Sequence, residues 1–213
     1  MRASSLFSMR PAEEAEHFPL ASQAREDYNT SIEVIDLTEW LALCDREGRP
    51  LGRGLLRGEM PPPGTYWRVS DAWFVDCAGR LLLQRRALGK KAHPGLWACT
   101  GGGVLHGESP EEGCVRECQE ELGVTPDFRR GGLVMGYVGE HSYHDVYLFH
   151  QSIPDSALRL QPEEVMDARW FTPEEARELT RTGAFVPLGY VEQLLLMLPV
   201  LSAGKDDEYA ESL

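Results

Sequence analysis

The chain has 213 residues, of which 42% are hydrophobic, and 21 basic against 34 acidic residues give it a formal net charge of −13. This length and hydrophobic content fit one folded domain with extensions. The acidic balance argues against nucleic acid as a partner, because phosphate backbones are bound by positively charged surfaces. A small phosphorylated substrate is still compatible with this charge, provided that a cation brings the two together.

The cysteines and the hydropathy of the chain indicate the cellular compartment to expect. The cysteines are odd in number and form no CxxC pair that would indicate a zinc site, so we expect reduced thiols in a cytoplasmic protein; they are Cys44, Cys77, Cys99, Cys114 and Cys118. The first twenty residues lack the apolar stretch of a signal peptide. No segment reaches the roughly 18 apolar residues of a membrane span, so we expect no membrane insertion.

The first half of the chain predicts an extension followed by strands. Residues 1–31 show neither strand nor helix periodicity and are interpreted as a polar N-terminal extension. Two apolar runs around a Gly/Pro turn predict a β-hairpin over residues 40–56. A second hairpin is expected over residues 66–87, and a short β-rich run at 95–100 leads into three glycines.

The second half predicts a helix, three strands and two more helices. The helix at 110–122 has Ser109 as N-cap, a proline at the first position, a glutamate three residues after the cap and Gly123 as its stop. Strands are expected within 131–153 and at 165–171, a helix start at 172–175, and a final helix over 188–201 that Pro199 should end early. Residues 32–202 then form a single domain and residues 203–213 an acidic tail.

Three glutamates of the 110–122 helix lie close together on a helical projection. Glu117, Glu120 and Glu121 are spaced i, i+3 and i+4, so their like charges destabilise the helix by a few tenths of a kcal/mol for each pair. One interpretation is a solvated acidic face. The other is a Mg²⁺ site, since Mg²⁺ is held by a few carboxylates together with substrate phosphates. The glycine turn before the helix favours the second interpretation, because glycines let a backbone approach a ligand closely and a helix N-terminus favours anions.

The stretch 101–124 resembles the Nudix box throughout. The matching residues are Gly102, then Glu108 after five residues, then seven residues and the run Arg116-Glu117-Cys118-Gln119-Glu120-Glu121-Leu122-Gly123-Val124. Cys118 is a mild departure, at a position where the pattern usually has an aliphatic residue. The resemblance implies an α/β (α+β) Nudix fold, in which a mixed β-sheet is sandwiched between helices, here with an extra N-terminal hairpin.

The same resemblance implies site residues and a cofactor, Mg²⁺ or Mn²⁺. Glu117 and Glu121 would be the main metal ligands, Glu120 an additional one, and the carbonyl of Gly101 would complete the set. Glu108 would pair with Arg116 to hold the loop against the helix. The metals lower the pKa of a bound water, and a carboxylate completes its deprotonation.

The sequence leaves open which carboxylate acts as the general base. In the Nudix superfamily it is sometimes a glutamate of the box, here Glu117 or Glu120, and sometimes an acid on a later loop. Glu164 and its neighbour Glu163 are the later-loop candidates, with Asp145 a third.

Residues 38–172 also resemble the branch that includes isopentenyl-diphosphate isomerase. The similarity includes a basic run, and its members are candidates to meet phosphate oxygens; they are Arg85, Arg86, Lys90 and Lys91. The isomerase needs a Cys-Gly-His between Trp97 and the box, whereas here Cys99 comes too early and no His follows it. Trp67 also stands where a metal-binding His is expected. These departures remove isomerase chemistry, while the intact box supports hydrolysis.

The sequence therefore predicts a metal-dependent hydrolase of a diphosphate linkage in a small organic or nucleoside diphosphate. Two alternatives stay open, which are an isomerase-like enzyme and a non-catalytic diphosphate-sensing module. The expected partner is a small-molecule diphosphate, without nucleic acid or membrane, and the 38–56 hairpin could pair across a homodimer. His93, His141 and His144 could line a pocket.

Overall fold

The computed structural model describes residues 39–203, and the predicted extension at 1–31 and most of the predicted tail at 203–213 lie outside this range. The strands are β1 (Trp40–Cys44), β2 (Pro50–Leu56), β3 (Tyr66–Val75), β4 (Leu81–Arg86), β5 (Trp97–Ala98), β6 (Thr100–Gly103), β7 (Gly131–Val138), β8 (Ser142–His150) and β9 (Val165–Phe171). The helices are α1 (Pro110–Leu122), α2 (Pro173–Arg181) and α3 (Val191–Leu201), with a short 3₁₀ turn η1 (Asp155–Ala157). The domain boundaries predicted from the sequence stay predictions.

Both predicted hairpins are present. β1 pairs antiparallel with β2, and β3 pairs antiparallel with β4. An aspartate shapes each turn: Asp45 Oδ1 accepts a hydrogen bond from the backbone N of Arg49 at 2.9 Å, and Asp76 Oδ1 accepts one from the backbone N of Arg80 at 2.8 Å. Aspartate side chains favour turns because they replace backbone acceptors in this way.

The strands form one mixed sheet organised around β3. β8 runs parallel to β3 along one edge, from the Trp67–Ser142 pair to the Val75–His150 pair. Three strands pair with successive parts of β3, namely β1 at its start, β6 in its middle and β4 at its end. The glycine strand β6 is therefore held against the centre of the sheet.

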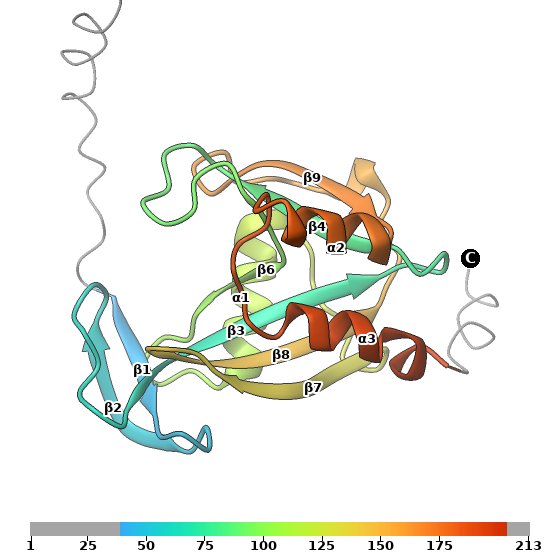
Figure 1. Cartoon of the computed structure of the whole chain (residues 1–213). Coiled ribbons are helices and arrows are strands. Elements are labelled where there is room, and N and C mark those ends of the chain that lie inside the picture. The colour runs from blue at the N-terminus through green and yellow to red at the C-terminus, as the bar shows by residue number, and fades with distance from the viewer. Residues whose placement is uncertain (1–38, 204–213) are drawn as a thin grey trace, which may run out of the picture. The chain divides into compact units, whose positions relative to one another are not determined.

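Helices cover both faces of this sheet, as the sequence predicted (Figure 1). On one face α1 contributes Cys114, Cys118 and Leu122 to a core that also contains Phe74 and Phe149. On the other face α2 and α3 cover a second core built on Trp73, Val75, Leu81 and Leu83. β3, β4 and β8 alternate their side chains between the two cores, which is why both cores are filled from the same strands.

The limits of α1 and the start of α2 agree with the capping signals. Ser109 Oγ accepts from the backbone N of Glu112 at 3.2 Å, and Glu112 Oε2 accepts from the backbone N of Ser109 at 2.7 Å. Gly123 ends α1 in the left-handed region at φ 69°. Thr172 and Glu175 form the same reciprocal box at the start of α2.

The prediction that Pro199 ends the last helix early is wrong. α3 continues through Pro199 to Leu201, and the backbone N of Ser202 donates to Leu198 O at 2.9 Å. A proline removes one N–H donor, but here it lies in the last turn, after the buried side chains of Leu194, Leu195 and Leu198 have packed against the sheet. Tertiary packing therefore outweighs the local penalty.

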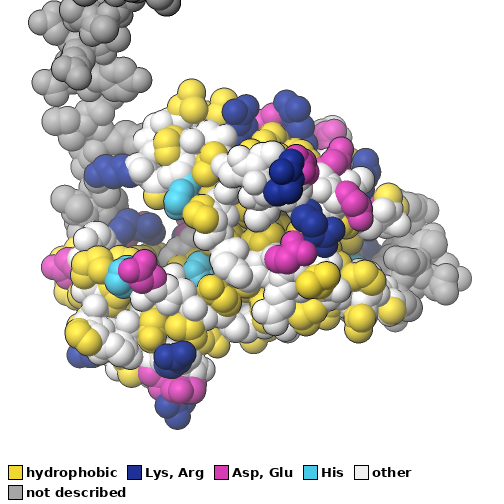
Figure 2. Space-filling view, in the orientation of Figure 1, with side chains coloured by type: hydrophobic (Ala, Val, Ile, Leu, Met, Phe, Trp, Pro, Cys, Tyr) yellow, Lys and Arg dark blue, Asp and Glu magenta, His cyan; other side chains and the backbone are white. Residues whose placement is uncertain are grey.

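No helix within residues 39–203 is long and apolar enough to cross a membrane. The five cysteines form no disulfide within residues 39–203. On the face shown in Figure 2, acidic and basic side chains lie beside one another and form no continuous basic patch.

Loss of the α1 cap should cost measurable stability. We expect Ser109→Ala to lower the free energy of unfolding by about 1 kcal/mol, because the backbone N–H of Glu112 loses its acceptor. Ser109→Thr keeps a hydroxyl and should stay within about 0.5 kcal/mol of the original. Urea unfolding followed by circular dichroism measures both, and equal losses for the two variants would contradict the capping role.

Candidate active site

The candidate site lies where α1 packs on the glycine strand β6. The Glu117 carboxylate reaches so close to Gly102 that a Cβ on that residue would lie 2.3 Å from Glu117 Oε1. A Cβ on Gly101 would lie 2.3 Å from the backbone O of Ser70 in β3. A side chain at Gly101 would push β6 away from β3, whereas a side chain at Gly102 would displace the Glu117 carboxylate from the strand, so the present close approach depends on glycine at both positions.

Glu121 is the most enclosed carboxylate of the site, with 4% of its surface exposed. Its Oε2 accepts from Gln84 Nε2 at 2.7 Å and from the backbone N of Gly101 at 3.4 Å. Burial first, and then the neighbouring charge of Glu117, raise the pKa of Glu121 to about 8, although the hydrogen bonds from Gln84 and the Gly101 backbone oppose the shift. The negative form of this group is therefore costly in the absence of a cation.

Glu117 is also buried, and burial raises the pKa of its carboxyl. Arg116 opposes this rise with its charge and with a hydrogen bond from Nη1 to Glu117 Oε1 at 2.8 Å, and Arg57 lowers the same pKa with its charge. Two desolvated carboxylates one helical turn apart repel each other, as the effect of Glu117 on Glu121 indicates.

Arg116 hydrogen-bonds to several segments of the box at once. Its Nε donates to Glu108 Oε1 at 2.9 Å, and its Nη2 donates to the backbone O of Gly103 at 2.9 Å. Glu108 Oε2 also accepts from the backbone N of Leu105 at 2.9 Å. The pairing expected between Glu108 and Arg116 thus connects the loop, the glycine strand and α1.

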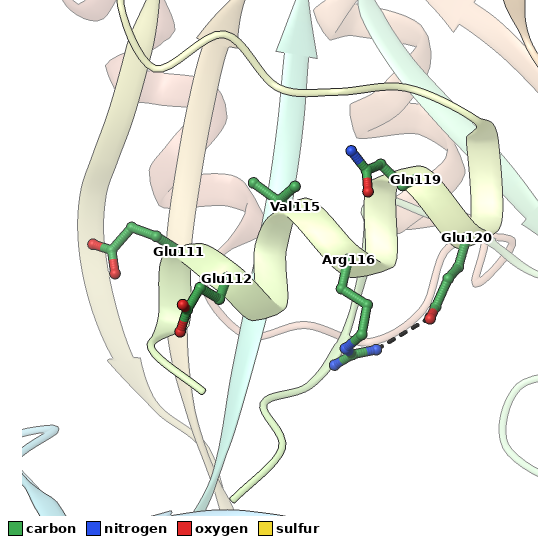
Figure 3. A pocket seen from close by; sticks show the side chains of 6 residues that line it. All are labelled: Glu111, Glu112, Val115, Arg116, Gln119 and Glu120. Carbon is green, nitrogen blue, oxygen red and sulfur yellow. Dashed lines mark hydrogen bonds and ion pairs between the residues drawn. The ribbon is translucent and has the colours of Figure 1, made fainter. Parts of the chain in front are cut away.

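Glu120 is the outermost of the three glutamates. Its side chain is 52% exposed and contacts Arg116 Nη1 at 3.2 Å (Figure 3). It faces an open hollow of about 540 Å³ on the outer side of α1, lined by Glu111, Glu112, Val115, Arg116, Gln119 and Glu120. Glu117 and Glu121 do not line this hollow, because they lie beneath the helix against the sheet.

The helical projection placed the three glutamates together, but the structure separates them into a buried pair and an outer member. Within residues 39–203, no three His, Cys, Asp or Glu side chains are already arranged as a metal-ligand group. Glu120 would have to leave Arg116 to join Glu117 and Glu121. Otherwise the remaining ligands would come from backbone, water and substrate, which is common for Mg²⁺.

The candidate bases occupy different surroundings. Glu164 pairs with Lys90 Nζ, and its charge contributes to the raised pKa of Glu121, so it lies near the buried pair. Glu163 is exposed. Asp145 is buried and accepts two hydrogen bonds from Arg68, the shorter from Nε at 2.7 Å.

Two arginines of the basic run already donate hydrogen bonds to backbone carbonyls of the loop that follows them. Arg85 Nε donates to the backbone O of Gly95 at 2.9 Å, and Arg86 Nε donates to the backbone O of Ala92 at 3.0 Å. Lys90 contacts Glu164, whereas Lys91 is exposed. The run therefore shapes the 87–96 loop, and its role toward phosphate stays a prediction.

A buried polar cluster supports β6 from the opposite face. Asp71 pairs with Gly101 across the sheet, and its Oδ2 accepts from Tyr190 Oη at 2.6 Å and contacts His144 Nδ1 at 2.7 Å. Burial raises the pKa of Tyr190 and that of the Cys99 thiol well above their ordinary values. His144 is thus held by a carboxylate, and Cys99 stays a protonated thiol with Tyr190 as its neighbour.

Sequence reasoning missed three residues of this region. Gln84 supports Glu121, Asp71 supports Gly101, and Arg57 acts electrostatically on Glu117. Each comes from a strand or hairpin distant along the chain from the box. The period-2 pattern could have placed Gln84 and Asp71 on their strands, but it carries no information on their partners.

Comparisons with known proteins agree with this geometry. The NUDIX domain family matches residues 65–189, which is more than half of the chain. An uncharacterized Nudix hydrolase of Listeria monocytogenes is 34% identical over 160 residues, covering 74% of this chain and 94% of that protein. An isopentenyl-diphosphate Delta-isomerase of Streptomyces avermitilis is 34% identical over 146 residues, covering 65% and 73%.

A solved structure supports the fold. The crystal structure of DR0079 from Deinococcus radiodurans superimposes with a TM-score of 0.60 at 25% identity, covering 75% of this chain and 99% of that one. The matched family, the relatives and the fold point the same way, and the chain belongs to the Nudix family.

Proposed function

We propose that the protein is a metal-dependent hydrolase of a diphosphate linkage in a small organic or nucleoside diphosphate. One observation carries this proposal, which is the pair of desolvated carboxylates, Glu117 and Glu121, packed against the glycine strand. A solvated acidic face would keep these groups in water, whereas here both are buried. Burial of two carboxylates is accommodated by protonation of one of them or by a positive partner, and a cation is the partner that would let both be charged.

The donor set suits Mg²⁺ or Mn²⁺. Carboxylate and carbonyl oxygens are the ligands that these hard cations prefer, and Glu117, Glu121, the Gly101 carbonyl and a reoriented Glu120 would hold them. When bound, the cation supplies positive charge for phosphate oxygens and makes a nearby water more acidic.

The chain's own residues would position the metal-binding carboxylates and deprotonate the attacking water. Arg116 holds Glu117 against β6, and Gln84 orients Glu121 through its Oε2. Glu164 is the best-placed acid outside the box to take a proton from the attacking water, because it lies near Glu121 and is only partly buried. Lys90, its ion-pair partner, keeps it in that position.

Other functional expectations stay proposals. The isomerase-like relatives keep that chemistry as a second candidate, but burial raises the pKa of the Cys99 thiol well above its ordinary value, so this thiol is a weak proton donor and does not readily become a thiolate base. A cytoplasmic location is supported by the free cysteines, and the homodimer stays a prediction.

Neutralising Glu121 should abolish turnover. We expect Glu121→Gln to lower kcat at least about 100-fold. The glutamine has the shape of the original side chain and an oxygen that can still accept from Gln84, but it lacks the negative charge that binds a cation. Phosphate release is measured with Mg²⁺ or Mn²⁺ on a panel of nucleotide sugars, dinucleotides and prenyl diphosphates. Glu174→Gln, an exposed acid at the start of α2, is the matched control and should be unchanged. No turnover on any substrate by the wild type, or full activity of Glu121→Gln, would contradict the proposal.

The same residue predicts a pH effect in the metal-free protein. The pKa of Glu121 is 4.5 as a free side chain and about 8 when folded, so between these values the unfolded state releases a proton that the folded state keeps. Stability contributed by the protonated group is therefore present at low pH and lost as the pH rises toward 8.

Chemical unfolding in a chelator measures this effect. Relative to Glu121→Gln, the wild type should lose at least about 1 kcal/mol between pH 5 and pH 8.5. Added Mg²⁺ should restore stability to the wild type and not to the variant. Parallel pH dependences of the two proteins would show that Glu121 is not desolvated.

The role of Glu164 as general base can be tested separately from that of its neighbour Glu163. We expect Glu164→Gln to lower kcat about 100-fold or more with little change in KM, since a general base acts in the chemical step. The acidic limb of the pH–rate profile should also be lost. Glu163→Gln, which alters an exposed acid, should leave both unchanged; a similar loss in this control would assign the effect to loop charge.

A further inference from the structure

The N-terminal hairpin, which precedes the matched residues 65–189, is hydrogen-bonded directly to the box. The backbone N of Ala42 donates to Val104 O at 2.8 Å, and the backbone N of His106 donates to Trp40 O at 2.7 Å. Leu41 and Leu105 form an antiparallel bridge between these bonds. β1 therefore fixes the position of the hairpin relative to the loop that follows β6.

The hairpin register carries Arg57 to this junction. Trp40 pairs with Leu56, so Arg57, the next residue, lies opposite Glu39. Its backbone N donates to Glu39 O at 2.9 Å, and its Nε donates to Glu39 Oε2 at 2.6 Å. These two bonds hold the backbone and the stem of the guanidinium in one orientation.

The outer end of the guanidinium lies at the glycine strand. A Cβ built on Gly103 would be 3.6 Å from Arg57 Nη2, which is an ordinary van der Waals distance, so this end of the guanidinium lies directly beside β6. Its charge also reaches Glu117, whose pKa it lowers. Within residues 39–203, the hydrogen bonds of Arg57 use its backbone N and Nε, which leaves the Nη protons for another acceptor.

Three other arginines near β6 or in the same hairpin already donate hydrogen bonds from their Nη atoms. Arg116 donates from both Nη atoms to carboxylates and a carbonyl, and Arg68 makes a two-pronged contact with Asp145. Arg49 pairs with Asp45 and Glu47 at the hairpin turn. Arg57 is 40% exposed in its side chain, so a ligand can approach it.

We propose that Arg57 of the N-terminal hairpin binds a phosphate oxygen of the diphosphate substrate beside β6, so that the hairpin forms part of the substrate site. This inference rests on the proposed function. Guanidinium is suited to this task because its paired N–H groups match phosphate oxygens and it stays charged. Glu39 holds the arginine in place without occupying its Nη atoms.

Binding of imidodiphosphate, a diphosphate analogue with a bridging nitrogen, tests the inference with Mg²⁺ by isothermal titration calorimetry. We expect Arg57→Gln to weaken binding at least about tenfold, and Arg57→Lys to weaken it several-fold because a point charge replaces the fork. Arg53→Gln, which removes an exposed arginine of the same hairpin, should stay within about twofold. Unfolding midpoints establish that the variants are folded, and Arg57→Lys decides if Arg57→Gln does not fold.

The outcomes separate the two proposals. If the wild type does not bind imidodiphosphate, both the inference and the diphosphate assignment fall. If the wild type binds and Arg57→Gln binds equally well, only the role of Arg57 is overturned. Equal weakening by Arg53→Gln and Arg57→Gln would assign the effect to the net charge of the hairpin and would likewise overturn the role of Arg57.

Discussion

The close approach of α1 to the glycine strand is the constraint on which the rest of this structure depends. Glu117 occupies the space where a side chain of Gly102 would be, and Gly101 lies against the backbone of β3. Because β6 pairs with the middle of β3, the carboxylates of α1 are brought to the centre of the sheet. Asp71, with Tyr190 and His144, supports the strand from the other face. The site is therefore braced from both layers of the sandwich.

This packing creates an electrostatic problem that defines the chemistry. Glu117 and Glu121 are desolvated and repel each other, and the hydrogen bonds from Gln84 and the Gly101 backbone offset only part of the cost. Arg116 is shared among several oxygens, so it stabilises the geometry without neutralising Glu121. A protein fold retains such a pair at the expense of stability when function needs it. A divalent cation is the partner that would relieve the repulsion and attract a diphosphate.

Sequence reasoning succeeded where the signal was local. The box, the capping residues and the glycine-containing turns act over a few residues, and the ends of α1 and the hairpins follow from them. It failed at Pro199, where the local penalty was outweighed by the buried apolar face of α3. The projection of α1 grouped three glutamates by angle, but only contact with β6 buries Glu117 and Glu121 and leaves Glu120 outside. Burial depends on neighbours that a single helix does not specify.

The sequence by itself determined the family motif, the limits of α1 and the identity of the acidic residues, because each is encoded in short-range spacing. Only the tertiary structure decided which carboxylates are desolvated and which groups face them. Gln84 and Asp71 reach the site from different strands, and Arg57 reaches it through a hairpin bonded to the box loop. The physical reason is that pKa values and ligand sites arise from contacts between segments far apart in the chain, and strand pairing sets those contacts.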